Sequence, residues 1–114
     1  MFFPQLSISE SIPAAASQTG NIRLGNFVLD TILVPSPWDA ANITFLVSQD
    51  GTNFFPLFDA AGNEVVLTAA AGRAIRFPPD FRIGFEFLRV RSGTNAVPVP
   101  QTAPRAIAIR GTQV

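Results

Sequence analysis

Residues 43–67 read ITFLVSQDGTNFFPLFDAAGNEVVL and contain two turn signals, Asp50-Gly51 and Gly62-Asn63. Glycine and asparagine adopt positive φ at little cost, so such pairs are typical of tight turns between strands. The run before the first turn is rich in β-branched and aromatic residues, which favour strands. The stretch therefore predicts strand, turn, strand, turn, strand.

The first of these strands has one strongly apolar face, because Ile43, Phe45 and Val47 alternate along it. Residues 85–91 read FEFLRVR and predict a second strand, with Leu88 and Val90 on one face and two arginines on the other. Apolar sheet faces need a second layer to cover them. We therefore expect a core formed by Phe45, Val47, Leu57, Leu88, Val90, Ile107 and Ile109.

Further short apolar runs predict strands at residues 6–9, 22–34, 73–77 and 105–109, separated by turns rich in glycine and proline. No segment of useful length shows a helical period. The pattern predicts an all-β fold, an antiparallel, jelly-roll-like β-sandwich of about eight short strands. A chain of 114 residues is expected to form one domain, with residues 1–20 as an N-terminal arm and first edge strand and residues 21–114 as the sandwich.

The chain is poor in charge, with 14% charged and 47% hydrophobic residues and a formal net charge of zero. All its basic residues are arginines. A neutral chain has no broad electrostatic field to attract a polyanion, so we expect no nucleic-acid partner. With so little charge available for the surface, we expect part of it to be buried by a partner.

The chain contains no Cys, His, Lys or Tyr. These absences exclude thiolate and Schiff-base nucleophiles, the commonest general base, and zinc sites built from Cys or His. We therefore expect no enzyme activity, no cofactor and no metal requirement. No apolar run approaches the 18 residues of a membrane span, and no basic segment opens a signal peptide, so we expect no membrane partner and synthesis in the cytoplasm.

Two local motifs each allow two interpretations. Residues 50–53, Asp-Gly-Thr-Asn, suit a hairpin turn, although their oxygens could also bind calcium; they lack the remaining acidic positions of an EF-hand loop. Trp38, Asp39 and Asn42 suit packing at the end of the sandwich. The same three residues could form a glycan contact, because an aromatic face with amide and carboxylate groups fits a pyranose.

The remaining charged residues give weaker signals. Two carboxylates can suffice for a glycosidase, but the sequence does not bring together any two of Asp59, Glu64, Asp80 and Glu86. Guanidinium groups can bind phosphate or carboxylate. Ion pairs with the acids of the chain are the default expectation for Arg73, Arg76, Arg89, Arg91 and Arg105.

The segments ITFLVSQDGTNF at 43–54 and LRVRSGT at 88–94, with residues 98–101 and Arg105, resemble small proteins encoded among the virion structural genes of tailed bacteriophages and prophages. The resemblance covers roughly residues 38–109. The pattern is also similar to discoidin-like sandwiches, in which a strand ends in Ser-x-Asp-Gly and a later strand contains Leu-Arg-Val. The resemblance implies an all-β structural module with no catalytic activity to transfer.

This resemblance leads us to expect a virion structural protein, most simply a capsid decoration or cement protein. It would work as a homo-oligomer, a trimer by analogy with virion surface proteins, docked on other virion proteins such as the major capsid protein. Its interface residues are expected to be Phe2, Phe3, Val97, Val99, Arg89 and Arg91. The alternative is a tail- or fibre-associated binding module that recognises another virion protein or a host glycan.

Overall fold

The structure is a computed structural model that describes residues 5–25, 27–78 and 84–113. The described residues form eight strands and no helix, and therefore contain no helix long and apolar enough to cross a membrane. The all-β prediction of about eight short strands is confirmed. The strands are β1 (Gln5–Ile12), β2 (Ile22–Arg23), β3 (Phe27–Leu33), β4 (Ile43–Ser48), β5 (Phe55–Pro56), β6 (Ala74–Arg76), β7 (Phe87–Ser92) and β8 (Arg105–Gln113).

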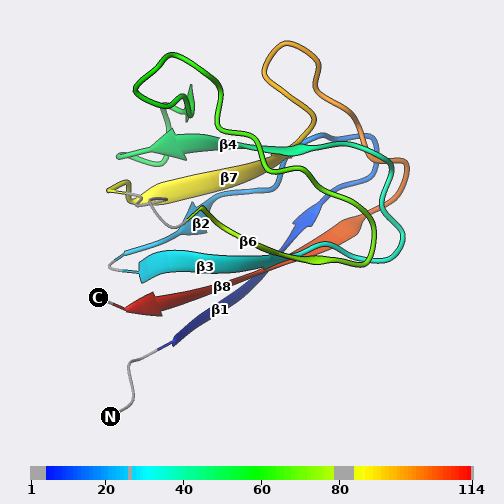
Figure 1. Ribbon diagram of the computed structural model, residues 1–114, viewed down its shortest axis with the longest axis horizontal. Coiled ribbons are helices and arrows are strands. Elements are labelled where there is room, and N and C mark those ends of the chain that lie inside the picture. Colours follow the sequence, from blue (N-terminus) through cyan, green and yellow to red (C-terminus); the bar gives the residue numbers. More distant parts are fainter. Residues whose placement is uncertain (1–4, 26, 79–83, 114) are drawn as a thin grey trace.

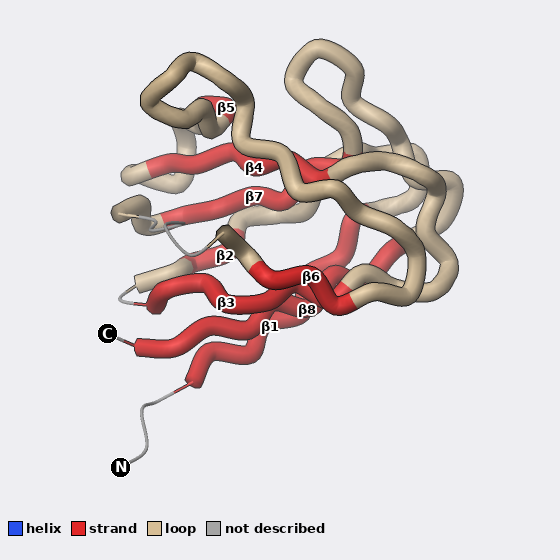
Figure 2. The backbone as a smooth tube through the Cα atoms, in the orientation of Figure 1, coloured by secondary structure: helices blue, strands red, loops and turns tan. Residues whose placement is uncertain are grey.

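Two four-stranded sheets make up the fold, with strand orders β1-β8-β3-β6 and β2-β7-β4-β5. We refer to them as sheet A and sheet B. All strand pairs are antiparallel. In Figure 1, β4, β7 and β2 of sheet B lie above β3, β8 and β1 of sheet A, and Figure 2 shows the long connections between them. This strand order is that of an eight-stranded jelly roll.

The core lies between the sheets, where alternate residues of each strand point inward. Six of the seven predicted core residues are buried, and the seventh, Leu57, is half-buried and packs against the core. The ring centroids of Phe45 and Phe77 lie 5.7 Å apart in a tilted pair. On β7, Leu88 and Val90 face the core as the alternation predicts.

Two features of the strands differ from or refine the prediction. The third strand expected after Gly62 is not a continuous strand: its residues make only isolated bridges, from Glu64 to Phe58 and from Leu67 to Ile43. Leu67 is buried beside Ile43 at the start of β4, so separate contacts fix the segment in place of a continuous ladder. By contrast, β1 is an edge strand, as its alternating sequence predicts.

Two long connections, residues 57–73 and 93–104, rise above β4 at the top of Figure 1. They meet where the backbone N–H of Asn95 donates to the carboxylate of Glu64 at 3.1 and 3.2 Å. These loops cover part of the outer face of sheet B, where Thr44 is buried although it points away from the core, and its hydroxyl donates to the Gly93 carbonyl at 2.7 Å. The outer face of sheet A has no such cover within the described chain, and Ser9 is exposed there.

Candidate functional site

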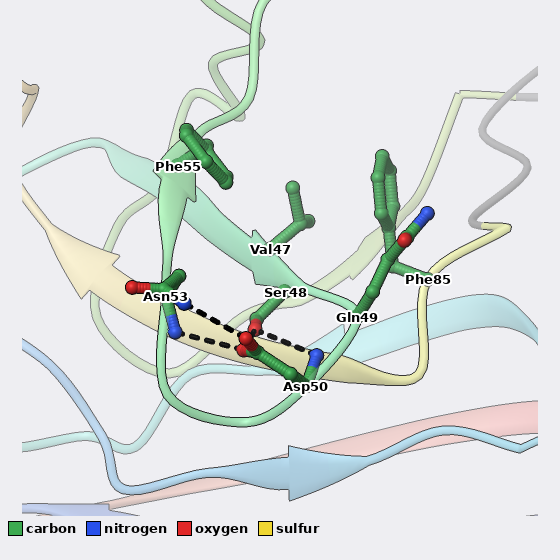
Figure 3. Close-up of a pocket in the computed structure, with 7 residues that line it drawn as sticks. All are labelled: Val47, Ser48, Gln49, Asp50, Asn53, Phe55 and Phe85. Carbon is green, nitrogen blue, oxygen red and sulfur yellow. Dashed lines mark hydrogen bonds between the residues drawn. The ribbon is translucent and has the colours of Figure 1, made fainter.

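An open cleft of about 340 Å³ lies beside the turn between β4 and β5. In Figure 3, the rings of Phe55 and Phe85 stand on either side of Val47, and Gln49 extends beside Phe85. Both the strand and the turn are needed to place these groups, because β4 supplies Val47 and the turn carries the polar side chains. The cleft is lined by Val47, Ser48, Gln49, Asp50, Asn53, Phe55 and Phe85.

The polar end of the cleft is built by Asp50. Its Oδ1 accepts the backbone N–H groups of Thr52 and Asn53, each at 2.8 Å, and its Oδ2 accepts the Asn53 amide at 2.8 Å. The Ser48 hydroxyl donates to the same carboxylate at 2.9 Å. These hydrogen bonds, led by the Asn53 N–H, lower the pKa of Asp50 far below its usual value. The carboxylate therefore holds the turn, and Gly51 supplies the predicted positive φ of 78°.

A calcium site at this turn has no support in the geometry. The oxygens of Asp50 already accept several hydrogen bonds from the turn itself. Throughout residues 5–25, 27–78 and 84–113, no group of three or more His, Cys, Asp or Glu side chains lies together as a metal site. Calcium needs six to eight oxygen ligands, so the hairpin-turn interpretation fits the structure.

A second feature is an exposed apolar surface on the two long loops, which shares Phe55 with the cleft. Among the described residues, five large hydrophobic side chains are at least 40% exposed, and four of them lie on or beside these loops. Phe55 and Val97 are the most exposed, at 65% and 66%. We call this set the apolar loop surface, and it consists of Phe55, Phe58, Val66 and Val97.

Arg91, predicted as an interface residue, is instead used inside the domain. It is 5% exposed, and its Nη2 donates to Glu64 at 2.8 Å while its Nε donates to the Thr44 hydroxyl at 3.0 Å. Its Nη1 also donates to Asn95 at 3.3 Å. The side chain thus ties both loops to sheet B and presents little surface to a partner.

Arg89, the second predicted interface arginine, is half-buried on the outer face of sheet B. Its guanidinium carbon lies 4.1 Å from the centroid of the Phe54 ring, a cation–π contact. It donates to Asn21 at 2.7 Å and to Gln18 at 3.2 Å. The arginine therefore joins the β4–β5 turn to the segment that precedes β2.

The other predicted interface residues lie in different surroundings. Val97 is exposed at the tip of its loop and belongs to the apolar loop surface. Val99 is half-buried, its N–H donates to the Ser92 carbonyl at 2.9 Å, and its own carbonyl accepts the Ser92 hydroxyl. Phe2 and Phe3 lie outside the described residues.

The proposed glycan contact at Trp38, Asp39 and Asn42 is not an open platform. Trp38 is 8% exposed and packs in the core, and its Nε1 donates to the Ala41 carbonyl at 3.1 Å. The ring has no free face for a sugar, so the packing interpretation holds. The Asn42 Oδ1 accepts the N–H of Ala69 at 3.2 Å.

The carboxylate of Asp39 also has a structural role. It accepts the Thr102 N–H at 2.6 Å and an Arg105 N–H at 3.2 Å. The Thr102 backbone bond is the main cause that lowers the pKa of Asp39, and Arg105 adds to it. The side chain fastens the loop before β8 to the loop before β4.

Sequence reasoning missed Gln101, which is completely buried beside this ion pair. Its amide donates to the Asp39 carbonyl at 3.1 Å and to the Ser92 hydroxyl at 3.0 Å, and its oxygen accepts the Asp39 N–H at 2.8 Å. Arg105 donates to the same oxygen at 3.3 Å. No local signal in the sequence reveals the burial of this residue, because glutamines are mostly exposed and proline-rich loops usually lie on the surface.

The other candidate carboxylates are engaged separately. Glu64 pairs with Arg91, and Glu86 pairs with Arg23 at 2.9 Å on the surface. Asp59 accepts the N–H groups of Ala61 and Asn63 in its own turn. Asp80 lies outside the described residues. The structure therefore brings none of the described members of this set together as a catalytic pair.

The fold and these surfaces define a small jelly-roll module that carries an aromatic cleft and an apolar loop surface. Comparison with protein-family models, with curated proteins and with solved structures finds no match for this chain. Its function is therefore argued from the surface that the two loops form.

Proposed function

We propose that this protein is a non-enzymatic structural protein of a tailed-bacteriophage virion, a capsid decoration or cement protein that docks through the apolar loop surface. The observation that carries the proposal is that Phe55, Phe58, Val66 and Val97 are all exposed and lie on or beside two loops that meet at Glu64 and Asn95. Exposed apolar patches on a small domain mark interaction surfaces. The partner is another virion protein such as the major capsid protein.

The loops are held in place before any partner binds. Glu64 accepts hydrogen bonds from Arg91 on β7 and from Asn95 on the neighbouring loop. Binding loses less conformational entropy when the contact surface is already ordered. A fixed apolar surface on a neutral, weakly charged domain suits a protein that binds permanently to a larger assembly.

Two further lines support the proposal. The resemblance of residues 43–54 and 88–94 to virion structural proteins points to the same class. The jelly roll is used by viral capsid and lectin domains, although this is an analogy at the level of fold and assigns no function by itself. We also propose that the protein associates with copies of itself on the virion.

The direct test is mass spectrometry of purified virions from the phage that carries this sequence, followed by binding of the purified protein to particles that lack it. The double variant Phe55→Ser/Val97→Ser should fold but co-sediment with particles at least about tenfold more weakly. Leu33→Ser is the matched control, because Leu33 is exposed on sheet A and does not belong to the apolar loop surface. Absence of the protein from virions would refute the virion assignment, and equal binding of the double variant would refute the docking surface.

The aromatic cleft favours a second candidate, a binding module for a glycan. Phe55 and Phe85 offer ring faces and Gln49 offers an exposed amide, which together suit a sugar ring better than the buried Trp38 does. When the protein is titrated with host surface polysaccharide and monitored by NMR, the chemical shifts of the Gln49 side-chain amide should change. Phe85→Ala should remove the shifts, and Val97→Ala should leave them unchanged.

A further inference from the structure

The two sheets of the jelly roll have four edge strands, and they differ greatly in length. Three are short: β2 and β5 have two residues each and β6 has three. β5 also contains Pro56, and β6 ends with Arg76. Short strands, prolines and charged side chains are devices that keep a sheet edge from pairing with other chains. The fourth edge strand, β1, has eight residues.

β1 is regular along its whole length. Its eight residues pair with β8 without a register shift, from Gln5 opposite Thr112 to Ile12 opposite Arg105. Within the described chain, no strand pairs with its other side. In an antiparallel strand, alternate backbone groups point away from the partner. β1 therefore presents a row of free N–H and C=O groups, and it contains no Pro, Lys or Arg; Glu10 is its one charged residue.

We propose that β1 pairs antiparallel with β1 of a second copy of this chain, so that the two A sheets join into one continuous sheet of eight strands. This inference rests on the proposed self-association. It replaces the trimer expected by analogy with a two-fold dimer, because antiparallel pairing of the same strand from two copies has two-fold symmetry.

The side chains of β1 suit pairing with themselves. Ser7, Ser9 and Ser11 are exposed on its outer face. A two-fold axis at Ser9 places serine opposite serine at each of these positions, and such small hydroxyl pairs are favourable across strands. On the inner face, the same register places Glu10 opposite Ile8 of the second copy. An axis at Glu10 is disfavoured because it would oppose two carboxylates.

The charge of the chain also permits this contact, since a formal net charge of zero gives two copies no overall repulsion. Glu10 is half-buried, with its carboxylate near Gly20 in the segment that borders sheet B. The Glu10 side chain therefore points toward sheet B. The outer face of β1 carries no charged residue.

Sedimentation of the full chain over a concentration series tests the proposal. The wild type should approach twice the 12.2 kDa mass of the chain. Ser9→Lys should raise the dissociation constant about tenfold or more, because it opposes two lysines at the strand edge. An equal mixture of Ser9→Lys and Ser9→Glu should restore the dimer. Ala106→Lys is the matched control: Ala106 is exposed on the same face, opposite Ser11 but one strand from the edge.

The contrary outcomes are distinct. A wild type that is monomeric at every concentration overturns both self-association and edge pairing, while binding of that monomer to virions would leave the docking proposal standing. A dimer that survives Ser9→Lys but is lost in Ala106→Lys overturns edge pairing in favour of stacked faces. A trimer overturns the two-fold arrangement. Equal melting temperatures of the Ser9→Lys and Ala106→Lys variants would show that Ser9→Lys loses the dimer without losing the fold.

Discussion

The guanidinium of Arg91 lies 2.8 Å from the carboxylate of Glu64, and the two side chains are only 6% and 14% exposed. The pair joins the outer face of β7 to the loop that follows β5. Because the Thr44 hydroxyl and Asn95 accept from the other two nitrogens of the arginine, each nitrogen of the guanidinium has a partner in a place with little water. The position of the apolar loop surface depends on this contact.

Removing the acid should therefore cost much more than removing a surface acid. Glu64→Ala should lower the free energy of unfolding by about 3 kcal/mol, because it leaves the buried Arg91 charge without a counterion. Glu86→Ala is the matched control, since its pair with Arg23 is exposed and should contribute at most about 1 kcal/mol. Urea unfolding of both variants measures the difference. Equal losses would show that Glu64 does not hold a buried charge.

The same substitution at two valines tests the assignment of core and surface. Val90→Ala should destabilise the domain by about 2 kcal/mol or more, because Val90 is completely buried between the sheets. Val97→Ala should change stability by no more than about 0.5 kcal/mol, because that side chain is exposed. Melting temperatures lowered equally by both changes would contradict the arrangement of the sheets.

Alanine substitutions at two glycines with positive φ allow the cost of backbone strain to be distinguished from the cost of a steric clash. Gly62 has a φ of 87°, and a Cβ there would meet no atom within 4 Å, so Gly62→Ala should cost about 1–2 kcal/mol from strain alone. Gly93 has a φ of 91°, but a Cβ would lie 2.5 Å from the Val97 carbonyl oxygen and 2.6 Å from the Val99 nitrogen. Gly93→Ala should therefore be clearly the more destabilising in thermal unfolding. A cost no larger than that at Gly62 would mean that the loop after β7 moves aside freely.

Acid should weaken the turn at Asp50. Hydrogen bonds lower the pKa of Asp50 in the folded state well below its usual value, so the unfolded state takes up a proton first as the pH falls. The stability that this carboxylate contributes is complete above about pH 4 and declines below it. The stability difference between the wild type and Asp50→Asn should therefore shrink as the pH falls below about 4. A difference that stays constant through the acid range would contradict the role of the carboxylate.

Local patterns in the sequence were sufficient for much of the fold. The alternation in residues 43–48 and 87–92 predicts both central strands of sheet B and their buried faces, because period two is a property of the strand itself. The turn at Asp50-Gly51 was predictable for the same reason: its hydrogen bonds span three residues or fewer. The ion pair with an acid that was expected for Arg76 is also present, with Asp30 at 3.4 Å.

The candidate site was less predictable because its contacts join distant parts of the chain. Arg91 and Glu64 are 27 positions apart, and Gln101 meets Asp39 across 62. No period or motif connects such residues. The exposure of Phe55 was hidden for a related reason: it belongs to an apolar run and lies opposite the buried Val47, and only the position of β5 at the edge of sheet B leaves its ring exposed.

The place of β8 between β1 and β3 has a consequence for how the protein is made on the ribosome. β8 is the last strand of the described chain, yet Gln5 near the start pairs with Thr112. Neither β1 nor β3 can find this shared neighbour until nearly all of these residues have been synthesised. Sheet A therefore forms after translation of the domain, and closing such long-range pairs makes folding slow, in milliseconds to seconds. Until then the apolar faces of β1 and β3 are exposed, and such surfaces make an incompletely folded chain prone to aggregation.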